Sequence, residues 1–144
     1  MTAKRTHSSL RTVIAMALAY YSIIFALAFG LGVARGLLIA PLIGETDAVL
    51  IEILIVLLAS QVVARRLVHN RRFSLAQLLV VGAIAFGLTM VSEAALAGVI
   101  RHQSLGQWTN SLTSPLGLLG LAGQIGFALM PTLTSIKIRL GSPK

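Results

Sequence analysis

Cysteine is absent from the 144 residues of this sequence, and acidic residues are scarce. Without cysteine the chain has no disulfide bond, no thiolate metal ligand and no thiol–disulfide chemistry. The four carboxylates are outnumbered by twelve lysines and arginines, so that the formal net charge is +8. In a soluble protein this charge would suggest a nucleic-acid partner. Here the basic residues flank long apolar runs, and the charge therefore indicates orientation in a membrane.

Sequence motifs of known enzymes are also missing. The chain contains no H-E-x-x-H, no G-x-S-x-G and no glycine-rich phosphate loop. Its histidines, His7, His69 and His102, lie in separate hydrophilic segments without the spacing of a metal site. We therefore predict no catalytic residue, no metal and no cofactor.

Hydrophobic residues make up 56% of the sequence, and its mean hydropathy of +0.89 is far above that of a soluble domain. A helix of about 20 apolar residues crosses a hydrocarbon core of about 30 Å. The short connections make sequential helices antiparallel neighbours. The predicted fold is all-α, a polytopic membrane protein with a four-helix antiparallel bundle. Its predicted helices are 12–34, 46–64, 74–100 and 112–136, between basic tails at 1–11 and 137–144.

Lysine and arginine are distributed unevenly between the two sides of the predicted bundle. Ten of the twelve lie in the two tails and in the connection 65–73, whereas only Arg35 and Arg101 lie on the other side. Loops that stay in the cytoplasm carry an excess of Lys and Arg. We therefore expect a multi-pass protein of the bacterial inner membrane with both termini in the cytoplasm.

The connection 65–73 contains a cluster of four arginines. We interpret the cluster as a topogenic signal that contacts anionic lipid headgroups. A nucleic-acid site would need aromatic groups for stacking, and only Phe73 is adjacent, so no nucleic-acid partner is predicted. The four residues are Arg65, Arg66, Arg71 and Arg72.

A cleaved signal peptide is the competing interpretation of the N-terminus. A basic region precedes an apolar one, and "ALA" at residues 26–28 has the form of a cleavage site. The apolar run continues to Ala34, which is longer than a typical signal-peptide core. We therefore expect a first spanning helix.

Three helices carry a polar group into the same half of the membrane. Counting ~1.5 Å per residue from the outer helix ends places Glu52 ~9 Å, Glu93 ~10 to 12 Å and Gln124 ~15 Å deep. An isolated charge at mid-bilayer costs about 2.5 to 3.5 kcal/mol, so both carboxylates should find partners or take up protons. Arg35, near the outer end of the first helix, is the obvious partner, and Gln124 can hydrogen-bond to Glu93.

A purely structural role is the alternative for each of these residues. Arg35 and Glu52 can reach the outer headgroups with their side chains. Glu93 is shorter and has Thr89 and Ser92 nearby, so proton or ligand handling and helix–helix contact both remain open. Glu45 and Asp47 fall in the first turn of the second helix, where negative charge favours the helix dipole.

The fourth helix has a clear start and an internal proline. Ser114 suits the N-cap position and Pro115 the first helical position. Glycines at 117, 120, 123 and 126 line an oblique groove that permits close helix crossing. Pro131 is expected to kink the helix or to end its regular part.

Short motifs between residues 30 and 131 resemble those of a group of small bacterial inner-membrane proteins. The resemblance implies four transmembrane helices and no assigned activity. It rests on Gly32 and Arg35 after a glycine-rich first helix, "PLIGE" at 41–45, Glu52, "SEAALA" at 92–97 and "FALMP" at 127–131.

Two functional hypotheses follow from this sequence. The preferred one is a small non-enzymatic membrane module or complex subunit, in which Arg35 holds Glu52 and Glu93 in register within a buried polar layer. Its partners would be the lipid bilayer and either a second copy or another membrane protein. The alternative is a small oligomeric transporter or channel that uses Glu93 to bind a proton or cation. An enzyme ranks third.

Overall fold

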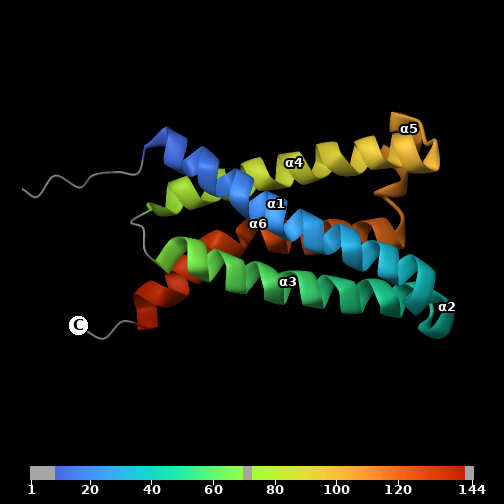
Figure 1. Ribbon diagram of the computed structural model, residues 1–144, viewed down its shortest axis with the longest axis horizontal. Helices are drawn as coiled ribbons and strands as arrows, with labels where there is room; N and C mark the ends of the chain where they lie inside the picture. Colours follow the sequence, from blue (N-terminus) through green and yellow to red (C-terminus); the bar gives the residue numbers. More distant parts are fainter. Residues whose placement is uncertain (1–8, 70–72, 142–144) are drawn as a thin grey trace, which may run out of the picture.

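The computed structural model describes residues 9–69 and 73–141, and most of them are helical (Figure 1). Four helical stretches of this part are long and apolar enough to cross a membrane, which confirms the all-α fold and supports a multi-pass membrane protein. The elements are α1 (Leu10–Ala34), the π-helical segment η1 (Arg35–Ile39), α2 (Ala40–Ile43), α3 (Glu45–His69), α4 (Leu75–Arg101), α5 (Leu105–Ser111) and α6 (Pro115–Gly141).

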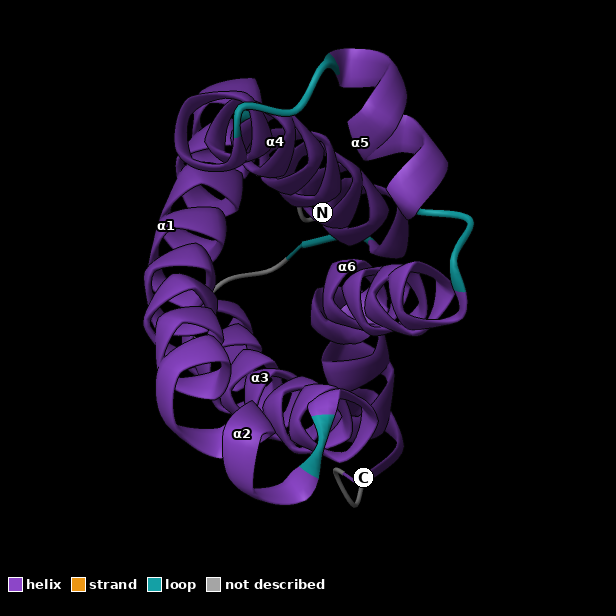
Figure 2. Cartoon of the chain, turned by 90° about the vertical axis from the view of Figure 1, so that its right-hand side faces the viewer, coloured by secondary structure: helices purple, strands orange, loops and turns teal. Residues whose placement is uncertain are grey.

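The four long helices form a ring in the order α1, α3, α6, α4 (Figure 2). Sequential long helices run antiparallel, as expected (Figure 1). They are not all neighbours, however, because α3 packs against α1 and α6 while α4 lies on the opposite side of the ring. The expectation that all sequential helices would be neighbours was therefore wrong for α3 and α4. The adjacent pairs α3/α6 and α1/α4 run parallel, and this order decides which polar side chains meet.

Helix boundaries extend beyond the apolar runs in several places. The second and fourth helices were expected to end at 64 and 136, but α3 continues to His69 and α6 to Gly141. An apolar run marks where a helix crosses the hydrocarbon, whereas a helix ends where its backbone is capped or interrupted. The basic side chains Arg65 and Arg66 lie exposed on the last turns of α3. Arg71 and Arg72 lie outside the described residues.

The first helix shows the largest departure from the expected boundaries. It was expected to end at Ala34, but helical backbone continues through η1 and α2 to Ile43. In η1 the amide of Ala40 donates to the carbonyl of Arg35, five residues earlier, which widens the turn. The chain then reverses at Gly44, whose φ of 92° is strained for any residue with a side chain. The predicted outer turn is thus mostly helical.

Side-chain caps set two further helix starts. Ser114 accepts from the amide of Gly117 at 3.0 Å, and α6 begins at Pro115 as the sequence predicts. The sequence prediction missed the short helix α5, although Ser104 and Gln107 form a capping box that starts it. The S-x-x-Q spacing was the available signal.

The packed core lies in the half of the bundle that contains the start of α1 and the end of α6. One cluster includes Val13, Phe73 and Leu78, and a second one, nearer the middle, includes Tyr20 and Phe127. No residue of α1 beyond Ile24 is buried. The half of the bundle near α2 and α5, hereafter the α2/α5 end, is therefore loosely packed.

Pro131 neither ends α6 nor leaves a carbonyl without a donor. Proline has no N–H, so the carbonyl of Phe127, four residues earlier, lacks its normal helical donor. The hydroxyl of Tyr20, which is fully buried on α1, donates to this carbonyl at 2.7 Å, and its ring stacks on Phe127 at 4.8 Å. A long-range side chain thus replaces the missing backbone bond, and the helix continues.

We predict that Tyr20→Phe lowers the free energy of unfolding by about 1.5 kcal/mol, because it leaves a buried carbonyl without a donor. The measurement is reversible unfolding in mixed detergent micelles. In a Pro131→Ala background the restored amide of residue 131 donates to the carbonyl of Phe127. The same Tyr20→Phe change should therefore lower the free energy of unfolding much less in that background. An equal cost in both backgrounds would refute this account.

Candidate functional site

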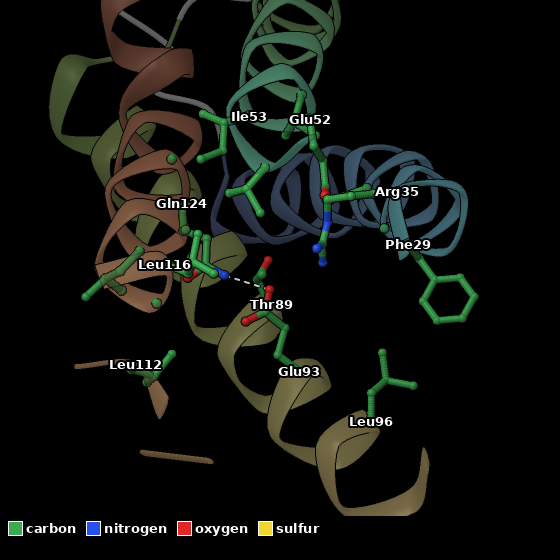
Figure 3. Close-up of a pocket in the computed structure, with 18 of the residues that line it drawn as sticks. Phe29, Arg35, Glu52, Ile53, Thr89, Glu93, Leu96, Leu112, Leu116 and Gln124 are labelled. Atoms are coloured by element: carbon green, nitrogen blue, oxygen red, sulfur yellow. Dashed lines mark hydrogen bonds and ion pairs between the residues drawn. The ribbon is translucent and has the colours of Figure 1, made fainter. Parts of the chain in front are cut away.

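A cavity of about 600 Å³ occupies the loosely packed α2/α5 end of the bundle (Figure 3). All four long helices line it, and its deepest residues, Ile24 and Phe127, belong to the middle core cluster. The volume falls within the range of small-molecule sites. Arg35, Glu52, Glu93 and Gln124, the four residues of the polar site predicted from the sequence, all line this cavity.

Arg35 forms ion pairs with two carboxylates of α3. Its Nε donates to Glu52 Oε2 at 2.6 Å, and its Nη1 donates to Glu45 Oε1. Gly32, one turn before Arg35, lies beside Glu52, whose Oε1 would be in ordinary van der Waals contact, at 3.6 Å, with an added Cβ. The ring order explains the pairing, because α1 is adjacent to α3.

One sequence expectation about these charges was wrong, and a second was incomplete. Arg35 does not hold Glu52 and Glu93 in register, because both of its ion pairs within the described residues are to α3. Glu45 and Asp47 do lie in the first turn of α3, but Glu45 is also a partner of Arg35. The sequence signal was available, since Glu45 and Glu52 are seven residues apart and share a helix face.

Glu93, on α4, meets Gln124 of the adjacent helix α6. The Nε2 of Gln124 donates to Glu93 Oε1 at 2.6 Å, which is the hydrogen bond expected from their depths. The hydroxyls of Thr89 and Ser92 serve other partners, since Thr89 donates to the carbonyl of Ala85 and Ser92 bonds to Tyr21 of α1. Glu93 therefore has a neutral amide as its hydrogen-bond partner and no ion pair within the described residues.

The charged groups on the cavity wall are unequally neutralised. Arg35 is shared by Glu45 and Glu52, whereas Glu93 has only the amide of Gln124. Arg101, eight residues after Glu93 on α4, is exposed at the rim. Its side chain has no ion pair within the described part of the chain. Sequence reasoning had assigned no site role to Arg101.

The arrangement suits binding of a ligand by charge and hydrogen bonds. Glu93 presents a carboxylate, and the Oε1 of Gln124 is a buried acceptor without a hydrogen-bond donor in the described structure. The described residues contain no cluster of three or more His, Asp or Glu side chains suited to a metal. No protein-family model, curated protein or solved structure matches the chain.

Proposed function

We propose that this chain is a non-enzymatic membrane module that binds a small cationic ligand in the cavity, with Glu93 as the principal binding group. The observation that carries the proposal is the charge distribution on the cavity wall. Among the described residues Glu93 has no ion pair there, since Arg35 is shared by Glu45 and Glu52 and Arg101 is exposed at the rim. A ligand ammonium group can supply the missing charge and donate to both Glu93 and Gln124.

We also propose that the α2/α5 end faces the outside of a bacterial inner membrane and that both termini are cytoplasmic. The described basic residues of the helix ends support this orientation. Arg11, Arg66 and Arg139 lie at the end of the bundle opposite the cavity. By the positive-inside rule, the cavity then opens toward the outer face.

Binding is better supported than conduction through a single chain. The pair formed by Tyr20 and Phe127 closes the bundle below the cavity, with a stacked ring and a hydrogen bond between α1 and α6. A transport cycle would have to open this contact. The cavity is therefore assigned a binding role, which a complex subunit can also perform.

The direct test is Glu93→Gln, with radiolabelled n-butylamine as the probe and purified protein in neutral detergent. We expect the affinity for butylamine to fall at least about tenfold, because the charged partner of the ammonium group is lost. The fold should persist, because a glutamine at 93 can still accept a hydrogen bond from Gln124 through its amide oxygen.

Asp47→Asn is the matched control for this test. It removes the same charge from an exposed position in the first turn of α3, away from the cavity lining. Butylamine affinity should therefore stay unchanged. An equal loss in both variants, or no loss in Glu93→Gln, would contradict the proposal.

A further inference from the structure

Where α1 and α4 line the cavity, several of their lining residues are also exposed to the surroundings of the bundle, which indicates a side opening between these helices. The hydroxyls of Tyr21 and Ser92 join these parallel helices at 2.5 Å. Toward the α2/α5 end, beyond this bond, α1 and α4 diverge (Figure 1). Phe29 of α1 and Leu96 of α4 lie on either side of the opening and line the cavity (Figure 3).

Both edges of this opening are apolar. On α1 the edge consists of Phe29 and Val33, and on α4 of Leu96 and Ile100, each pair spaced by four residues and so on one helix face. Phe29 is 45% exposed, Val33 47% and Ile100 60%. These residues line the cavity and are also open to the surroundings of the bundle. In a membrane-spanning helix pair, those surroundings are lipid chains.

The interior of the cavity carries polar groups, whereas the edge of the opening is apolar. The polar groups Glu93 and Gln124 lie deeper along the helices than Val33 and Ile100, which border the opening. A molecule that satisfied both regions would carry a hydrogen-bond donor with positive charge at one end and hydrocarbon at the other. A fully water-soluble cation would leave the apolar edge without a function.

We propose that the cavity takes an amphiphilic amine from the membrane, with its ammonium group on Glu93 and its hydrocarbon chain between α1 and α4. The opening formed by Phe29, Val33, Leu96 and Ile100 is the entrance, and we call it the lateral portal. This inference rests on the proposed cation-binding function and adds the class of ligand and its route. An anionic headgroup is disfavoured deep inside the cavity, because Arg35 already serves two carboxylates and Arg101 is exposed at the rim.

The test compares two amines of different chain length in phosphatidylcholine nanodiscs. Dodecylamine represents the membrane amphiphile, and n-butylamine reports on the Glu93 site alone. The double variant Val33→Ser/Ile100→Ser makes the edge of the portal polar. We expect it to weaken dodecylamine binding by about tenfold, because the chain loses apolar contact, while butylamine affinity stays unchanged. Empty nanodiscs supply the correction for partitioning.

Leu54→Ser/Leu58→Ser is the matched control for the portal variant. These leucines are also four residues apart, are 61% and 64% exposed on α3, and do not line the cavity. Binding of both amines should be unchanged in this control. Equal dodecylamine affinity in the portal variant and the control would overturn the lateral portal. Loss of the proposed function looks different, because Glu93→Gln would then leave the binding of both amines unaffected.

A second experiment blocks the portal covalently. The chain has no cysteine, so Phe29→Cys/Leu96→Cys introduces the only two thiols, and a bifunctional thiol reagent can bridge the helices. The bridged protein should still bind butylamine but should no longer bind dodecylamine. Each single cysteine variant, treated with the same reagent, should bind both. Undiminished dodecylamine binding by the bridged protein would overturn the proposal.

Discussion

Gly82→Ala should lower the free energy of unfolding by about 3 kcal/mol or more, although it adds a single methyl group. A Cβ at this position would lie 1.9 Å from the carbonyl oxygen of Ala128 and 2.9 Å from its carbonyl carbon. Both atoms belong to the backbone of α6, so no side-chain rotation can make room. The helices α4 and α6 would have to separate, and the packed core beside them would be disturbed.

Gly87→Ala is the matched control for this prediction. It makes the same change on the same helix, at a position where an added Cβ meets no atom within 4 Å. Because alanine favours helix over glycine, this variant should be neutral or more stable by up to about 1 kcal/mol. Unfolding of both variants in mixed micelles provides the comparison. Similar stabilities for the two would show that α4 and α6 do not cross as closely as described.

The sequence could not predict which glycines lie at a close helix contact. The glycines of the fourth helix were expected to form a groove for close crossing, and Gly123 and Gly126 do pack against side chains of Ile53 and Leu57. Gly120, from the same pattern, meets nothing within 4 Å. A glycine in a sequence permits close approach but does not specify which helix approaches. That depends on the ring order, which no local pattern encodes.

The four spanning helices were predictable because long apolar runs dominate their free energy in a membrane. Counting residues from the helix ends also placed Glu93 and Gln124 at similar levels of the bundle, and the two side chains do form a hydrogen bond. The partner of Arg35 was not predictable. Counting residues gives the level of a side chain along the bundle but does not say which helix lies beside it. The pairing with α3 follows from adjacency of α1 and α3, and the pairing with Glu45 from the continuation of helical backbone past Arg35.

The second large effect is expected at this ion pair. Arg35→Met should lower the free energy of unfolding by about 3 kcal/mol, because Glu45 and Glu52 would both lose their cationic partner. Both side chains of the pair with Glu52 are largely shielded, with 25% of Arg35 and 22% of Glu52 exposed. The effect should therefore lie at the lower end of the range for buried pairs. Unfolding in mixed micelles measures it.

The double variant Arg35→Met/Glu52→Gln separates the loss of an ion pair from the loss of packing. Glu52→Gln removes the more shielded of the two carboxylates left unpaired, which should recover a substantial part of the stability, since an uncompensated charge is costlier than a missing pair. If the double variant is as unstable as Arg35→Met alone, the ion pair with Glu52 is not what stabilises this end of the bundle.

Amine binding should respond in the opposite direction to stability. Arg35→Met leaves Glu45 and Glu52 on the cavity wall without their guanidinium, so butylamine affinity should rise relative to the unmodified chain. Adding Glu52→Gln should return the affinity toward its original value, because the one further carboxylate of the wall that then lacks a guanidinium is Glu45, whose side chain is 50% exposed. Under the proposed function Arg35 thus has two separable effects. It stabilises the contact between α1 and α3, and it restricts cation binding to Glu93 by neutralising the carboxylates opposite.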